Sequence, residues 1–257
     1  MFRNEYLVAL QTITYKEVKR FLRIWVQTLL PSMISTTLYF LIFGTLIGSK
    51  IGQMKGYDYM DFIVPGLILM AVISNAYSNV VSSFYGSKFQ HNIEEMLVAP
   101  MPGWVILTGY ISGGVLRGLI VGVLVTIVSL FFTDLQIAHP VMMVIVFLLT
   151  GILFSAAGFI NAVYAKSFDD ISIVPTFVLT PLIYLGGVFY SIDLLPAFWQ
   201  KVSLLNPVLY MVDVFRFSIL GTSDISLLSG FAVIITFIIC LLGISLRLLS
   251  KGIGIRN

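Results

Sequence analysis

Six long apolar segments, separated by short polar stretches, set the pattern of the chain. A helix needs about 20 apolar residues to cross the hydrocarbon core of a bilayer. Because lipid offers the backbone no hydrogen-bond partners, each segment is expected to be an α-helix, and the alternation typical of membrane barrel strands is absent. The pattern predicts an all-α membrane protein in a single domain, residues 1–257, with six transmembrane helices at about 24–48, 62–85, 104–132, 140–165, 173–190 and 227–249.

The composition excludes a soluble protein. Hydrophobic residues make up 58% of the chain and charged residues only 11%, whereas soluble domains have about 25% charged residues. The net charge is +3, but the Lys and Arg residues flank the apolar segments and form no basic run with interleaved aromatics. They therefore indicate membrane topology rather than a nucleic-acid surface.

The distribution of Lys and Arg predicts the orientation. Ten of them fall on the side of the two termini and four fall on the other side. The positive-inside rule then places both termini in the cytoplasm, which an even number of helices allows. The first apolar segment is as long as a full span and lacks a small-residue cleavage site, so we expect it to stay in the mature protein.

Residues 1–23 have the pattern of an amphipathic helix. A basic amphipathic helix of this kind lies in the cytoplasmic headgroup layer. The same charges also serve as a topology signal, and both interpretations are compatible. The row at helical spacing is Phe2, Tyr6, Leu10, Ile13 and Glu17, and the basic cluster elsewhere on the helix is Lys16, Lys19, Arg20 and Arg23.

The stretch between the second and third segments, residues 86–103, predicts a short cytoplasmic helix. Ile93, Met96 and Leu97 fall on one face, and Pro100 and Pro102 end the helix. Such a helix is either a docking element or part of an ordinary solvated loop. Its candidate residues are Asn92, Ile93, Glu94, Glu95, Met96 and Leu97.

Residues 191–226, between the fifth and sixth segments, are too apolar for a free loop and too interrupted for a span. Pro196 and Pro207 divide the stretch into two pieces. Irregular backbone at membrane depth survives only when it is buried in protein or lines water. We therefore predict a re-entrant hairpin of two short helices on the external side.

Polar residues within the spans are candidates for a pathway lining or for helix–helix hydrogen bonds. Arg117 is the one ionisable residue well inside a segment. By contrast, Gly114, Gly118 and Gly122 in the third segment predict close helix packing. The candidate pathway residues are Ser35, Thr36, Ser74, Asn75, Ser78, Asn79, Ser82 and Arg117.

The sequence lacks the residues that several kinds of binding and catalysis require. No G-x-x-x-x-G-K-[ST] loop is present, so the chain is not expected to hold ATP by itself. His91 and His139 lie in loops and Cys240 is the one cysteine, so neither a metal site nor a nucleophile–base pair is expected. The scarcity of acids in the spans argues against an ion-coupled carrier.

Four motifs identify a family resemblance. FIVPGLILM begins at Phe62, NIEEMLVAPMPGW at Asn92, FDDISIVPTFVLTPLIYLGGVFYSIDLLP at Phe168 and LNPVLYMVDVFR at Leu205. In this order and on six apolar segments, they resemble inner-membrane permeases of the ABC-2 type from Gram-negative bacteria. The resemblance covers nearly the whole chain.

The resemblance implies a homodimeric exporter of the bacterial inner membrane, with one ATPase subunit docked on each copy and with ATP and Mg²⁺ bound by that subunit. The helix around Glu94, Glu95 and Met96 would couple to the ATPase, and the N-terminal helix would touch the same subunit. The first, second and fifth spans would face the substrate route. Family cargoes are lipids, glycolipids, polysaccharides or drugs. The re-entrant cap would be formed around Pro196, Asn206, Pro207 and Tyr210.

Two other classes remain open at this stage. An ion-gradient-driven carrier would be expected to show inverted repeats and membrane carboxylates, and neither is visible in the sequence. The polar residues within the spans and the re-entrant segment argue against a membrane scaffold without transport.

Overall fold

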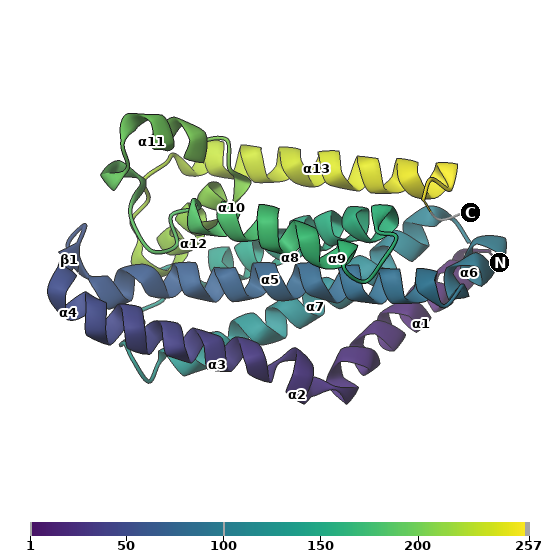
Figure 1. Ribbon diagram of the computed structural model, residues 1–257, viewed down its shortest axis with the longest axis horizontal. Coiled ribbons are helices and arrows are strands. Elements are labelled where there is room, and N and C mark those ends of the chain that lie inside the picture. Colours follow the sequence, from purple (N-terminus) through teal and green to yellow (C-terminus); the bar gives the residue numbers. More distant parts are fainter. Residues whose placement is uncertain (1, 100, 255–257) are drawn as a thin grey trace.

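The computed structural model describes residues 2–99 and 101–254, and the side chains from residue 5 onward within those ranges. Pro100 and the side chains of Phe2, Arg3 and Arg256 lie outside the described part, and the two arginines are among the ten basic residues counted on the side of the termini. The described chain is mostly helical and forms an elongated bundle (Figure 1). This confirms the predicted helical class.

Within the described residues, five helices are long and apolar enough to cross a membrane, or six if one bent pair counts as a single span. The predicted first, second, third, fourth and sixth segments each correspond to one of the five. These are residues Trp25–Ile51, which comprise α2 (Trp25–Thr28), α3 (Leu30–Tyr39), η1 (Phe40–Ile47) and α4 (Gly48–Ile51), together with α5 (Tyr59–Phe89), α7 (Gly103–Ser129), α8 (Pro140–Tyr164) and α13 (Leu227–Lys251).

Helix α5 is the axis of the bundle. It packs along α7 and α8 and touches α12 (Pro207–Leu220). Of its most apolar stretch 78% is buried, compared with 11% for Trp25–Ile51 and 17% for α13. The glycine ridge on α7 makes this packing possible: a Cβ at Gly118 would lie 3.2 Å from Ala76, and one at Gly122 would lie 2.8 Å from Val72. The predicted packing role of these glycines is confirmed.

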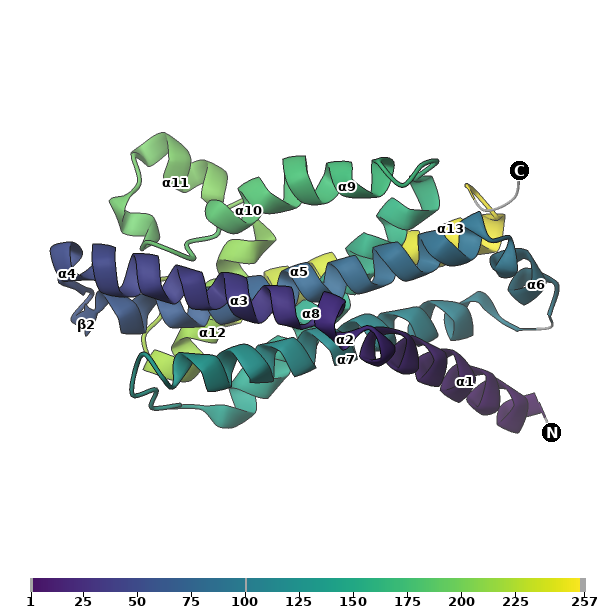
Figure 2. The ribbon, with the colours of Figure 1, turned by 60° about the horizontal axis from the view of Figure 1, so that its bottom comes forward.

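Helix α1 (Phe2–Arg23) matches the predicted N-terminal helix, and it leaves the bundle obliquely (Figure 2). Its inner face packs on α7 through Ile13 and Glu17, which lie against Gly109 and Gly113. Glu17 and Phe21 are fully buried. The helix is therefore anchored to the bundle by one face and exposes its basic face.

The predicted fifth span, 173–190, is shorter in the structure. The helical segment is α9 (Asp170–Val174), η2 (Pro175–Leu179) and α10 (Thr180–Tyr184), and at about 1.5 Å per residue it reaches only about 22 Å. It ends at Tyr184 because Gly187 adopts a left-handed conformation, φ +72°, which turns the chain out of the helix. The six-span count then depends on the bent pair.

The bent pair is α11 (Ala197–Ser203) and α12, which meet at 87°. The breaks fall at the predicted prolines, since Pro196 caps α11 and Pro207 opens α12. Asn206 fixes the bend, because its Oδ1 accepts from Val208 N at 2.9 Å and its Nδ2 donates to the Leu182 carbonyl at 2.6 Å. The bend is thus tied to α10.

The bundle has two distinct ends (Figure 1). The terminal end holds the start of α1, helix α6 (Asn92–Val98) and the end of α13. The hairpin end holds α4, α11, η3 (Ile192–Leu194) and a short antiparallel hairpin formed by β1 (Gln53–Met54) and β2 (Tyr57–Asp58). The two termini of the described chain lie at the same end.

Candidate transport pathway and coupling site

A cavity of about 280 Å³ opens between α3 and α5, and we call it the serine pocket. Four of the predicted pathway residues line it together: Ser35, Thr36, Ser74 and Asn75. Its remaining walls are neutral, and among the described residues that line it none is charged. The whole lining is Pro31, Ser32, Ser35, Thr36, Tyr39, Leu67, Met70, Ala71, Ser74 and Asn75.

Arg117 supports the serine pocket from behind and does not line it. The Arg117 Nη2 donates to Asn75 Oδ1 and to the Thr28 carbonyl, both at 2.9 Å. Asn75 in turn donates to Ser32 Oγ at 2.7 Å. The guanidinium, on α7, therefore fixes an α5 amide and the end of α2 in one arrangement.

A second set of predicted residues serves to hold α1. Arg20 donates to Asn79 Oδ1 at 2.9 Å and to the Asn79 carbonyl at 3.0 Å, and it pairs with Glu17 at 3.2 Å. Ser83 donates to the other Glu17 oxygen at 2.6 Å. Asn79 is fully buried, so it docks a helix and does not line the serine pocket. We call Glu17, Arg20, Asn75, Asn79, Ser83 and Arg117 the stripe network.

The two remaining predicted pathway residues on α5, Ser78 and Ser82, do not line the serine pocket. Ser78 is half-buried and its carbonyl accepts from Ser82 Oγ at 2.7 Å. Ser82 is exposed and lines a second cavity of about 660 Å³, which we call the basic groove. This groove lies between α1 and the end of α5, and its lining is Thr12, Tyr15, Lys16, Lys19, Arg20, Arg23, Ser82, Ser83, Gly86, Ser87, Gln90 and Asn92.

The predicted short helix after α5 is present as α6, Asn92–Val98. His91 adopts a left-handed conformation, φ 60°, which turns the chain sharply out of α5, and its Nδ1 donates to Glu94 Oε1 at 2.8 Å. Ile93 is buried at 1% exposure, whereas Glu94 and Glu95 are exposed. The helix is thus anchored by one apolar side chain and presents its acids outward at the terminal end.

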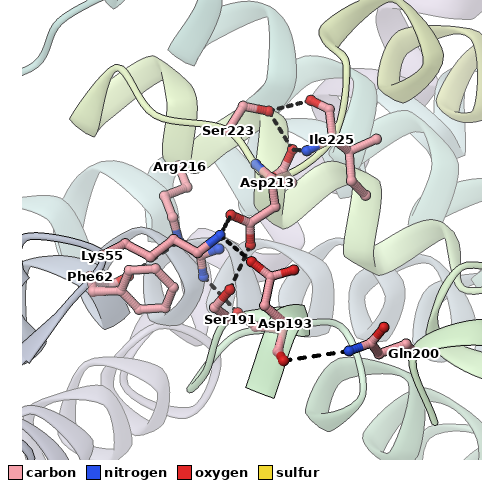
Figure 3. A network of polar contacts seen from close by, with 11 residues as sticks. Lys55, Phe62, Ser191, Asp193, Gln200, Asp213, Arg216, Ser223 and Ile225 are labelled. Carbon is pink, nitrogen blue, oxygen red and sulfur yellow. Dashed lines mark hydrogen bonds and ion pairs between the residues drawn. The ribbon is translucent and has the colours of Figure 1, made fainter. Parts of the chain in front are cut away.

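The hairpin end holds a third polar cluster, which is shown in Figure 3. The sequence pattern did not predict it. Asp213 is buried, and it accepts from Ser223 Oγ at 2.6 Å, Asp224 N at 2.7 Å and Ile225 N at 3.1 Å. Lys55 in the β-hairpin bonds Asp193 at 2.7 Å and also bonds Asp224. These contacts tie three loops together.

Arg216 completes this cluster. It is buried, it donates to the Gly187 carbonyl at 2.6 Å, and its guanidinium lies 3.9 Å from the Phe62 ring centroid. It therefore holds the turn at which the α10 segment leaves its helix. We call Lys55, Asp193, Asp213, Arg216, Ser223 and Asp224 the hairpin-end network.

The residues predicted to cap the pathway lie around this network. Pro196, Asn206 and Pro207 form the breaks of the bent pair, and Tyr210 Oη donates to the Leu204 carbonyl at 2.8 Å across the bend. Arg216 is one of the four basic residues that the predicted topology places on the side opposite the termini. Its contacts with Gly187 and Phe62 join residues far apart in the chain, and no local pattern signals them.

The charge state of Lys55 follows from its surroundings. Burial lowers its pKa, but the hydrogen bonds and charges of Asp193 and Asp224 raise it more, and the net direction is upward. The ammonium form is therefore retained at all ordinary pH values.

A metal site is not formed by the described residues, in which no three His, Cys, Asp or Glu side chains gather. Cys240 is exposed on α13. The polar features of the described chain are thus the serine pocket, the basic groove, α6 and the two networks.

Comparison with known proteins places this geometry in context. The family model for the ABC-2 type transporter matches residues 8–220. The inner membrane transport permease YadH of Escherichia coli K12 is 58% identical over 252 residues, which is 98% of each chain. Nodulation protein J of Rhizobium leguminosarum bv. viciae is 24% identical over 87% of each chain, and that of Rhizobium meliloti is 23% identical over 76% of this chain and 75% of its own.

Proposed function

The chain belongs to the ABC-2 type transporter family, and from this premise we propose that it is the membrane subunit of an ATP-driven exporter whose ATPase is a separate polypeptide. In this proposal two copies of the chain pair in the inner membrane and each docks one ATPase subunit. The chain itself supplies no catalytic residue. ATP and Mg²⁺ are bound by the partner.

The observation that carries the proposal is the exposed acidic face of α6 beside a buried anchor. Ile93 fixes the helix to the bundle, so a push on Glu94 and Glu95 reaches α5 through packed contacts. α5 is also the helix that lines the serine pocket. ATP-driven closure of the partner therefore has a short mechanical route to the pathway.

The serine pocket supports an uncharged, amphipathic cargo. Its walls combine hydroxyls and one amide with apolar side chains, and none of the described lining residues offers a charge to an ion. Aromatic rings adjoin it: Tyr39 lies 5.9 Å from Phe43 and 6.0 Å from Phe189, and Tyr184 stacks on Phe189 at 5.6 Å. Lipids, glycolipids, polysaccharides and apolar drugs fit such a surface better than a small ion.

Pairing of two copies is supported by the exposed first span. Only 11% of the Trp25–Ile51 apolar stretch is buried, and the serine pocket lies along this helix. In a dimer closed by the first span, the two pockets face one route. The bent pair would then cap that route from the hairpin end, with Asn206 and Arg216 fixing its position.

Orientation follows from charge. The terminal end carries most of the Lys and Arg residues, so it faces the cytoplasm and puts α1 and α6 where an ATPase is available. The hairpin end then lies on the periplasmic side of the inner membrane.

Charge reversal on α6 tests the coupling role. We expect the double variant Glu94→Lys, Glu95→Lys to lose most of its ATPase partner in a capture assay from the native host, because like charges replace complementary ones. The matched control reverses two exposed acids of the hairpin end, Asp58→Lys and Asp134→Lys. Equal capture by both doubles would contradict the assignment of α6.

A further inference from the structure

The basic groove is a built cation cluster rather than a scattered set of surface charges. Lys16, Lys19 and Arg23 are spaced along one face of α1, they are exposed, and all three line the cavity. Among its described lining residues none is acidic. Glu17, the acid nearest in sequence, is fully buried and accepts from Arg20 and Ser83. Among the described residues, the three exposed cations therefore have no counter-charge in the groove.

Arg20 forms one wall of the groove. Its hydrogen bonds to Asn79 join α1 to α5, and its ion pair with Glu17 lies within α1. Neutral donors complete the lining. Ser87 Oγ accepts from Tyr110 Oη at 2.9 Å, so its own hydroxyl hydrogen is available to a ligand. The side-chain oxygen of Gln90 accepts from Asn92, so its amide hydrogens are available as well. Convergent cations with neutral donors are what phosphate oxygens require.

The neighbouring surface distinguishes a lipid from a free anion. On the other flank of α1 lies a second groove of about 580 Å³, with walls that include Leu10, Val18 and Thr108. The two grooves share Tyr15, over whose ring Lys19 lies at 5.7 Å. A free phosphate would occupy only the basic groove, whereas an amphiphile would place its headgroup there and its apolar part in the second groove.

We propose that the basic groove binds the phosphate of an anionic lipid headgroup, held by Lys16, Lys19 and Arg23, with its chain directed along the groove beyond Tyr15. This binding is separate from export and does not depend on an ATPase. Because α1 is joined to α5 through Arg20 and Asn79, an occupied groove steadies α1 beside the stripe network.

The test uses the full chain in nanodiscs of phosphatidylcholine that contain a minor fraction of phosphatidylglycerol, followed by native mass spectrometry of the lipids retained. Each Lys or Arg near an anionic surface changes affinity about five-fold, so the triple variant Lys16→Gln, Lys19→Gln, Arg23→Gln should retain phosphatidylglycerol about a hundred-fold less well. The control triple, Lys166→Gln, Arg247→Gln, Lys251→Gln, removes the same charge from exposed sites at the same end and should retain it fully.

Three results would overturn the proposal. One is equal retention of phosphatidylglycerol by the two triples. Another is complete displacement of the lipid by millimolar inorganic phosphate, which would make the groove a free-anion site. The third is normal lipid retention with loss of ATPase capture, which would make it a protein contact. If the triple does not fold, Lys19→Gln alone should lower retention about five-fold, and unchanged retention would count against the lipid site.

Discussion

The stripe network and the hairpin-end network both surround buried charges, but they satisfy those charges differently. At the hairpin end, Asp213 accepts three hydrogen bonds and Arg216 donates to a carbonyl while stacking on Phe62. In the stripe network, Arg20 Nε, Asn79 Nδ2 and Arg117 Nε are buried without a hydrogen-bond partner among the described residues.

The difference indicates which of the two networks is the more rigid. A fully bonded buried network is costly to break, because every released group loses its partner in a low-dielectric setting. A partly bonded network has donors to spare, so a shifted arrangement costs less. The stripe network lies between the serine pocket, α1 and the route from α6, which is where the proposed ATP-driven movement passes.

The largest effect is expected from Asp213→Ala. It leaves Ser223 Oγ and the Asp224 and Ile225 amides without their acceptor and removes a charge near Arg216, at a cost of about 3 kcal/mol or more. Thermal unfolding of the purified protein in detergent measures it. Asp193→Ala is the control, because Asp193 is 68% exposed and its pair is worth about 1 kcal/mol or less. Similar losses in the two variants would contradict a locked hairpin end.

The second largest loss of stability is expected from Gly66→Ala, at the point where α5 approaches the turn held by Arg216. A Cβ at Gly66 would lie 2.6 Å from the Val188 carbonyl oxygen and 2.8 Å from Val188 Cα, so Gly66→Ala should cost about 1–3 kcal/mol. Gly86→Ala on the same helix has open space around it and should be neutral or slightly stabilising. A melting temperature for Gly66→Ala that equals the wild-type value would show that this turn is loose.

Arg117→Gln separates stability from function. The shorter, neutral Gln removes a buried charge but also removes two hydrogen bonds, so the free energy of unfolding should change by only about 1 kcal/mol. It should nonetheless lower ATPase stimulation in the reconstituted complex, because Asn75 and the Thr28 carbonyl lose their shared donor beside the serine pocket. Full stimulation at normal stability would mean that Arg117 is only a packing residue.

The smallest effect is expected from Lys55→Met. Lys55 is 32% exposed, so its ion pairs should contribute about 1 kcal/mol or less and should weaken with salt. Its pKa is raised in the folded state, so this stabilisation is present below the ordinary lysine pKa and is lost only as the pH rises through the raised value. Lys50→Met, at an exposed lysine, is the control in salt-dependent melting.

The sequence predicted the features that depend on local pattern. Apolar length located five spanning helices, proline positions located the breaks of the bent pair, and glycine spacing located the α7 ridge. It also placed Ser35, Thr36, Ser74 and Asn75 among the candidate pathway residues, and these four line one pocket in the structure.

The features it missed depend on contacts between distant residues. Glu17 was read as part of an apolar row, but its burial follows from Ser83 and Arg20, which face it only after α1 packs on α7. The early end of α10 depends on a left-handed Gly187. The pairing of Lys55 with Asp224 joins positions 169 residues apart. Periodicity carries no information about such pairs.

The central claim is that this chain works with a separate ATPase, and co-purification from the native host tests it most directly. The tagged chain is solubilised mildly and its partners are identified by mass spectrometry, alongside a known membrane complex as the control for preservation. The account predicts a P-loop ATPase in a one-to-one ratio with the chain. Absence of any ATPase while the control complex survives intact would contradict it.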